Sequence, residues 1–179
     1  IDRLAGNERV RALGETGLDF FRTREAAGQA QQRESFAAHI AMAKRHGKTV
    51  VIHDRDAHQA VLDVLDTEGP PDRIVMHCFS GDVVMARKCV ERGYFLSFAG
   101  TVTFKNAREL RNSLAVTPLE RVLVETDAPF LTPEPHRGAT NAPYLVPLTV
   151  RVMAGVLNVD VPSLCTAISD NSERVYGPW

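Results

Sequence analysis

The stretch TVVIH at residues 49–53 is a β-branched apolar run that ends in a histidine. Such a run predicts a strand that is buried on both faces, as in a fully covered parallel sheet. The segment before it, residues 25–46, has a helical pattern in which Phe36, Ile40 and Ala43 recur at i, i+4 and i+7. A buried strand that follows an amphipathic helix is typical of an α/β protein.

The same alternation continues along the chain. Further strands are expected at 10–19, 73–79, 94–98 and 121–126. Further helices are expected at 57–68, 82–92, 106–114, 144–157 and 162–176. The first strand contains Gly14 and Gly17, so we expect it to be short and to run into a glycine-broken loop. Alternating elements imply parallel strands, and two architectures fit them: a doubly wound open sheet or a (β/α)₈ barrel.

Four side chains that can bind metals follow the ends of expected strands. They are Glu15, His53, His77 and Asp127. The carboxyl ends of parallel strands meet at one rim, where α/β enzymes place their active sites. Two imidazoles and two carboxylates suit a divalent metal, which makes a bound water a usable nucleophile near neutral pH. A single histidine at a strand end is more often structural, but four equivalent positions favour a metal centre. Strands this far apart converge on one point only in a barrel, so the set also favours the (β/α)₈ architecture.

The composition excludes some classes of protein. The 179 residues include 21 Lys and Arg against 22 Asp and Glu, a formal charge of −1, which disfavours a strongly basic nucleic-acid-binding module. No apolar run reaches the roughly 20 residues that span a bilayer, so we expect no membrane association. The three cysteines are widely spaced, which predicts reduced thiols in a cytoplasmic protein.

The remaining basic residues and histidines give weaker evidence for a place in the functional site. Several cations follow strand ends or lie in rim loops, where they could hold phosphate groups. These are Arg22, Arg55, Lys105 and Arg137. In contrast, His39, His46 and His58 fall in helical segments, and we expect them at the surface.

Taken together, four motifs resemble one known family. They are GETGLD at 14–19, HCFSG at 77–81, GTVTFK at 100–105 and ETDAPFL at 125–131. Their order and content resemble the TatD-type metal-dependent hydrolases of the amidohydrolase-like superfamily, over nearly the whole chain. The resemblance implies a TIM barrel and hydrolysis of phosphodiester bonds in DNA, usually as a 3′–5′ exonuclease. It also implies divalent metal ions, Mg²⁺ first and Mn²⁺ or Zn²⁺ as alternatives, with up to two ions in the intact protein.

The resemblance further implies roles for single residues. Glu15 would be the carboxylate shared between two metals, and His53 and His77 would ligate one ion. Asp127 would ligate a metal and take the proton from the attacking water, so that it and Glu15 would be the catalytic carboxylates. A further set would contact the substrate or the loops that shape its groove. These residues are Arg22, Ser80, Arg137 and Asn141.

Two features depart from the family pattern. The chain has no His-x-His motif, which in the family supplies two further metal ligands from the first strand. We therefore expect residues 1–179 to be a single domain that forms about the C-terminal two thirds of a TIM barrel, with about six strands and the N-terminal strands missing. A full barrel has about 250 residues, so roughly 70 would be absent. In addition, Ala142 stands where the family usually has Glu.

Two other functions remain open. The same site could serve a metal-dependent esterase or deacylase that acts on aminoacyl-tRNA or another small ester, which suits the near-neutral charge. A truncated chain without His-x-His could also be a non-catalytic fragment. We expect DNA as the substrate partner and a monomer when the protein is intact.

Overall fold

A computed structural model describes residues 1–178 and divides the chain into two compact units. The first unit consists of Ile1–His77 with Val175–Trp179, and the second consists of Cys78–Arg174. The expectation that residues 1–179 form one domain stays a prediction.

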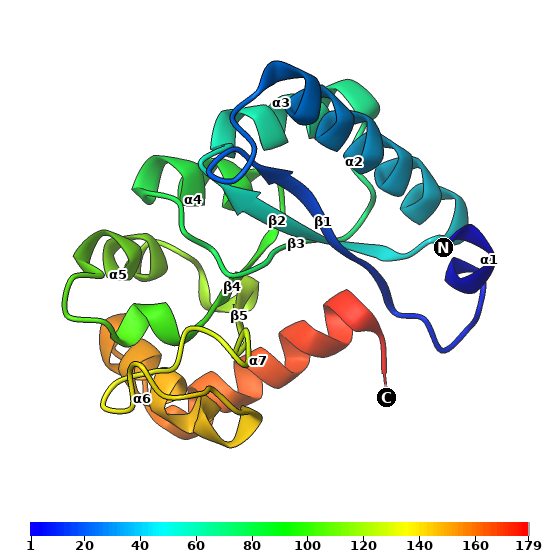
Figure 1. Cartoon of the computed structure of the whole chain (residues 1–179). Helices are drawn as coiled ribbons and strands as arrows, with labels where there is room; N and C mark the ends of the chain where they lie inside the picture. Colours follow the sequence, from blue (N-terminus) through cyan, green and yellow to red (C-terminus); the bar gives the residue numbers. More distant parts are fainter. Residues whose placement is uncertain (179) are drawn as a thin grey trace. The chain divides into compact units, whose positions relative to one another are not determined.

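The first unit is built on three neighbouring parallel strands. Its elements are α1 (Asp2–Ala5), β1 (Ala12–Asp19), α2 (Ala26–His46), β2 (Thr49–Arg55), α3 (His58–Glu68) and β3 (Ile74–Met76). Strand β2 pairs with both β1 and β3, and the register places Gly17 opposite His53 and Val50 opposite Ile74. Helices α2 and α3 pack against each other and lie on the same side of the strands (Figure 1). The expected order of parallel strands and crossover helices is therefore confirmed in this unit.

The core of the first unit uses the residues that the helical pattern indicates. Phe36, Ile40 and Ala43 of α2 are fully buried, as are Val50 and Ile52 of β2. Helix α2 ends at Gly47, whose φ of 59° allows the left-handed turn that leads into β2. The apolar stripe thus fixes α2 on the strands, and the glycine sets where the chain turns back.

Strand β1 differs from the expectation of a short strand with a glycine-broken loop. It is continuous over eight residues, with a register irregularity between Leu13 and Thr16. The two glycines do not form a loop. Their lack of a side chain lets the backbones of β1 and β2 approach closely. A Cβ on Gly14 would lie 2.6 Å from the Cβ of Val51, and a Cβ on Gly17 would collide with the carbonyl oxygen of His53. Gly17 also has a φ of 143°, which side-chain-bearing residues rarely adopt.

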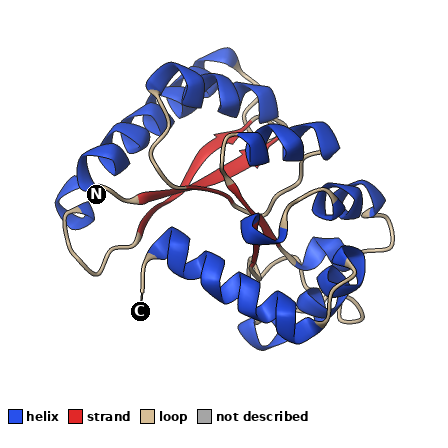
Figure 2. Cartoon of the chain, turned by 180° about the vertical axis from the view of Figure 1, so that it is seen from behind, coloured by secondary structure: helices blue, strands red, loops and turns tan. Residues whose placement is uncertain are grey.

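The second unit contains two paired strands and the C-terminal helices. Its elements are α4 (Val83–Glu91), β4 (Phe95–Phe98), η1 (Gly100–Thr103), α5 (Arg108–Ala115), η2 (Leu119–Arg121), β5 (Val122–Val124), η3 (Pro143–Leu145), α6 (Val146–Leu157) and α7 (Val161–Tyr176), the last two residues of α7 falling in the first unit. Strands β4 and β5 are parallel, with Leu96 opposite Val122. The carboxylate of Asp82 caps α4 by accepting the N–H of Met85. Figure 2 distinguishes the helices, strands and loops by colour.

Two strands are shorter than expected. The strands expected at 73–79 and 121–126 extend only over Ile74–Met76 and Val122–Val124. Cys78 and Asp127 follow them with φ values of 44° and 56°, which turn the chain out of the extended conformation. The described residues form five strands, whereas the sequence suggested about six.

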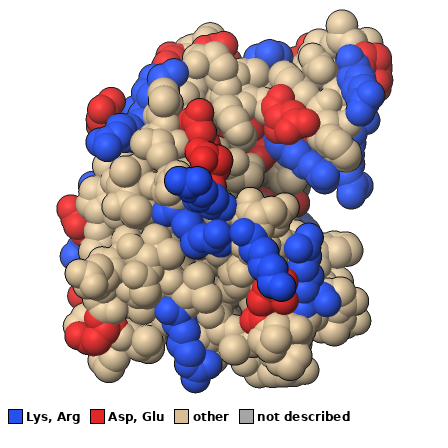
Figure 3. All heavy atoms as spheres, turned by 90° about the vertical axis from the view of Figure 1, so that its left-hand side faces the viewer, with Lys and Arg blue, Asp and Glu red and all other residues tan. Residues whose placement is uncertain are grey.

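Within residues 1–178, no single helix is long and apolar enough to cross a membrane. Residues Pro143–Leu157 and Val161–Tyr176 pass that test only as a pair, and the pair is bent by 105°. On the face in Figure 3, basic side chains gather in groups among acidic ones, in line with the formal charge of −1.

The close approach at Gly17 generates a prediction. We expect Gly17→Ala to lower the free energy of unfolding by about 3 kcal/mol or more, because a Cβ there meets the β2 backbone and the φ is strained. The control is Gly47→Ala, which has a positive φ but no neighbour within 4 Å and should cost only about 1–2 kcal/mol. Urea unfolding followed by circular dichroism measures both. Equal losses would show that β1 and β2 do not depend on this contact.

Candidate metal centre

Three of the four expected metal ligands come together in the first unit. Glu15 projects from β1 and His53 from β2, and His77 directly follows β3. Oε2 of Glu15 lies 2.8 Å from Nε2 of His77 and 3.8 Å from Nδ1 of His53. One ligand atom from each of the three residues lies within 4.8 Å of the other two. The parallel order of β1, β2 and β3 thus brings residues 15, 53 and 77 to one point.

The donor set fits a divalent cation. It offers one carboxylate and two imidazoles, a combination found with Zn²⁺, Mn²⁺ and related ions. Both histidines are half-buried, whereas the side chain of Glu15 is 52% exposed. A cation bound there would therefore be held by partly desolvated ligands and still be open to water or a substrate.

A pocket of about 270 Å³ lies beside the cluster. Its lining residues are Glu15, Thr16, Gly17, Asp19, Gln32, Ser35, His39 and His53. The expectation that His39 lies at the surface is wrong. Its side chain is half-buried, and its Nδ1 lies 2.9 Å from Oγ1 of Thr16. His46 and His58 are also half-buried and contact Asp2 and Asp54, respectively. Because α2 packs on β1, polar residues of a helix become part of the pocket wall.

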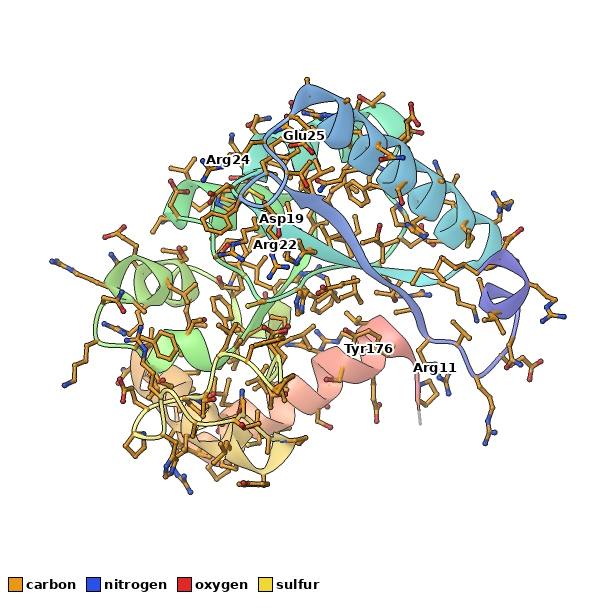
Figure 4. The ribbon with its side chains drawn as sticks, viewed as in Figure 1. Arg11, Asp19, Arg22, Arg24, Glu25 and Tyr176 are labelled. Carbon is orange, nitrogen blue, oxygen red and sulfur yellow. The ribbon has the colours of Figure 1, made fainter. Side chains whose placement is uncertain are left out.

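Asp19 at the end of β1 connects the cluster to the loop that follows. Its Oδ2 lies 3.4 Å from Nε2 of His53, and its Oδ1 accepts the backbone N–H of Arg22 at 2.8 Å. Burial disfavours the charge, but the bond from Arg22 and the contact with His53 outweigh it and hold the pKa of Asp19 below its ordinary value. Figure 4 shows Asp19 and Arg22 together at this end of β1, with Arg24 and Glu25 along the same loop and Arg11 at the strand's other end.

The fourth expected ligand, Asp127, belongs to the second unit. It is half-buried just beyond β5, and its carbonyl oxygen accepts the N–H of Phe130 at 2.8 Å. Nearby, Oε2 of Glu125 accepts the N–H of Cys78 at 3.1 Å. The assignment of Asp127 as a ligand stays a prediction.

The expected substrate-contacting residues differ in exposure. The side chain of Arg22 is 78% exposed, and Ser80 and Arg137 are also exposed. The guanidinium of Arg137 lies 4.2 Å from the ring centroid of Phe104. Asn141 is only 4% exposed. Its amide nitrogen donates to the carbonyl oxygens of Thr126 and Phe130, which indicates that this side chain shapes its loop.

Arg55, at the end of β2, is held in a similar way to Arg137. Its guanidinium lies 4.0 Å from the ring centroid of Phe21, a residue that is 48% exposed. Lys105 is exposed, and its carbonyl oxygen accepts a bond from Arg111. Stacking on an aromatic ring reduces the freedom of a guanidinium but leaves its N–H groups available to an anion.

Sequence reasoning gave no role to Asp19, Gln32 or His39. Asp19 lies four residues after Glu15. Because side chains alternate between the two faces of a strand, this spacing puts both carboxylates on one face and could have indicated that Asp19 lies near the ligand cluster. His39 lies three residues after Phe36, close to the buried stripe of α2, which also indicated an inward position. Nothing in the local pattern indicated that Gln32 would bond to the backbone of Asp19.

Comparison with known proteins places the chain in a family. The sequence profile described as "TatD related DNase" matches residues 1–177. The metal-dependent hydrolase TatD of Mycobacterium tuberculosis is 49% identical over 180 residues, which cover 99% of this chain and 68% of that protein. The metal-dependent hydrolase YcfH of Escherichia coli K12 is 43% identical over 175 residues, covering 97% of this chain and 65% of that protein. The chain thus spans about two thirds of the length of these relatives.

Solved structures agree with the expected fold class. The TatD homologue YJJV from Escherichia coli superposes with a TM-score of 0.91 at 26% identity, over 99% of this chain and 69% of that one. A TatD family hydrolase from Entamoeba histolytica gives a TM-score of 0.81 at 19% identity, over 96% and 65% of the two chains. The predicted α/β architecture of the TIM-barrel type is confirmed by this likeness. The chain belongs to the TatD related DNase family, a family of metal-dependent hydrolases.

Proposed function

We propose that the protein hydrolyses phosphodiester bonds of DNA with the help of divalent metal ions, as a 3′–5′ exonuclease. The observation that carries this proposal is the cluster of Glu15, His53 and His77, whose ligand atoms lie within 4.8 Å of one another. Glu15 lies within β1, His53 lies near the carboxyl end of β2, and His77 directly follows β3, whose carboxyl end is where such folds place their chemistry. Family membership supports the same type of reaction.

Glu15, His53 and His77 would hold the metal. When bound, a divalent ion would supply Lewis acidity that activates water and stabilises the negative charge on the reacting phosphate. We propose Mg²⁺ first, with Mn²⁺ or Zn²⁺ as alternatives that the two imidazoles also suit. Following the resemblance, we propose Asp127 as a further ligand and as the group that takes the proton of the attacking water. We also propose that the protein acts in the cytoplasm.

The basic residues next to the cluster support a phosphate-bearing substrate. The register of β1 and β2 places Asp19 opposite Arg55, two residues beyond the pair of Gly17 and His53. Arg55 therefore stands at the end of β2, two residues beyond His53, and Arg22 lies in the loop after β1, 3.9 Å from Asp19. Guanidinium groups bind phosphate oxygens through two parallel hydrogen bonds, so these side chains are suited to hold the DNA backbone.

The first prediction concerns the metal ligands. We expect Glu15→Ala and Asp127→Ala each to lower the metal-stimulated rate of DNA hydrolysis by at least about 100-fold, since each removes a proposed ligand. The control is Glu34→Ala, which removes an exposed carboxylate of α2. Initial rates on 5′-labelled DNA, with circular dichroism to confirm folding, measure the effect. Full activity in both variants would show that the site is assigned wrongly.

The second prediction separates the proposed substrate from the ester alternative. With one metal and one preparation, we expect shortening of single-stranded DNA from its 3′ end and no comparable turnover of an aminoacyl-tRNA ester. The length ladder of a 5′-labelled oligonucleotide reports the polarity, and release of the amino acid reports deacylation. Faster deacylation than DNA cleavage would favour the esterase, and neither activity would favour a non-catalytic fragment.

The third prediction concerns Arg55. We expect Arg55→Ala to raise KM for DNA several-fold with little change in kcat, and to reduce the slope of log KM against log salt by about one, because one phosphate contact is lost. Arg9→Ala, an exposed arginine before β1, is the matched control. Rates measured over a series of salt concentrations test this. An unchanged slope in Arg55→Ala would exclude a phosphate contact.

A further inference from the structure

We propose that Asp19 is a positioning residue for His53: its Oδ2 accepts the Nε2–H of the ring and leaves Nδ1 free to bind the metal. This inference rests on the proposed function, because it concerns how one ligand of the same site is oriented. It assigns a role to a residue that is neither a proposed ligand nor a proposed substrate contact.

The two nitrogens of His53 face different carboxylates. Nδ1 lies 3.8 Å from Oε2 of Glu15, on the side of the ligand cluster. Nε2 lies 3.4 Å from Oδ2 of Asp19, on the side of the loop after β1. A neutral imidazole carries one N–H, and a carboxylate can only accept, so Asp19 favours the tautomer with the proton on Nε2. The lone pair on Nδ1 then points toward Glu15.

Asp19 is itself held firmly enough to orient a ring. Its Oδ1 accepts the N–H of Arg22 at 2.8 Å, and its own N–H donates to Oε1 of Gln32 at 2.9 Å. The amide nitrogen of Gln32 in turn donates to Oγ1 of Thr23 at 2.9 Å. The side chain of Asp19 is only 16% exposed, so water competes weakly for the remaining oxygen. The loop after β1 therefore holds the carboxylate of Asp19, and α2 holds its backbone through Gln32.

The two histidines of the cluster present different nitrogens. His77 approaches Oε2 of Glu15 through Nε2 at 2.8 Å, whereas His53 approaches the same oxygen through Nδ1. Only one of the two flip states of the His53 ring gives this arrangement, because a half-turn flip about Cβ–Cγ would put Cδ2 in the place of Nδ1 and Cε1 in the place of Nε2. A carboxylate behind the ring is a common way to fix both the tautomer and the ring orientation of a metal-binding histidine. Asp19 occupies that position.

The experiment compares Asp19→Asn and Asp19→Glu with the wild type and with Asp72→Asn, an exposed carboxylate of the first unit. The first measurement is the ¹⁵N chemical shifts of the His53 ring at pH 8 in metal-free protein. We expect the Nε2–H tautomer in the wild type and Asp72→Asn. In Asp19→Asn we expect a shift toward Nδ1–H, because the new amide can donate to Nε2. Asp19→Glu should retain part of the wild-type pattern.

The second measurement is Mn²⁺ affinity, followed by the loss of the free-ion electron paramagnetic resonance signal. We expect Asp19→Asn to bind Mn²⁺ about 10- to 100-fold more weakly than the wild type, and Asp72→Asn to bind as tightly. Wild-type affinity and tautomer in Asp19→Asn would overturn the role of Asp19 and leave the metal site intact. A wild-type Nδ1–H tautomer would also overturn it, whether or not the variants fold. No Mn²⁺ binding by the wild type would overturn the proposed function and this inference together.

Discussion

The candidate site depends on the close approach of the β1 and β2 backbones. At Gly17 the two strands come so near that a Cβ would collide with the carbonyl oxygen of His53. This contact fixes the register, and the register decides which side chains of β1 stand beside His53. Glu15 precedes the contact on β1 and Asp19 follows it, so one glycine lets two carboxylates reach the same imidazole from different sides.

Much of the fold can be predicted from short sequence patterns that are compatible with only one type of secondary structure. The β-branched run ending at His53 is apolar on both faces, and it forms the central strand of the first unit. Phe36, Ile40 and Ala43 share one helix face, and all three are fully buried, as their recurrence at i, i+4 and i+7 predicts. The expected places of Glu15, His53 and His77 at the ends of parallel strands suffice to predict their convergence, although the structure extends β1 and β2 past Glu15 and His53 and leaves only His77 beyond a strand end.

Other features could not be predicted because they depend on partners far away in the sequence. A glycine in a strand pattern indicates either a loop or a close approach, and only the neighbouring strand decides between them at Gly14 and Gly17. His39 lines the pocket because α2 packs on β1, which places its ring beside Thr16. The ends of β3 and β5 are equally non-local in origin, because Cys78 and Asp127 adopt positive φ values that no β-propensity indicates.

The near-zero net charge is compatible with a polyanionic substrate if the cations are placed locally. Phosphate contacts act over about a Debye length, so distant charges contribute little at physiological salt. In the first unit Arg55 is stacked on Phe21, and in the second Arg137 is stacked on Phe104. Each ring restricts a flexible guanidinium before any substrate arrives, which lowers the entropy lost on binding. If the proposed DNA substrate is correct, a few pre-oriented arginines would hold it without the self-repulsion that a uniformly basic surface of high net charge brings.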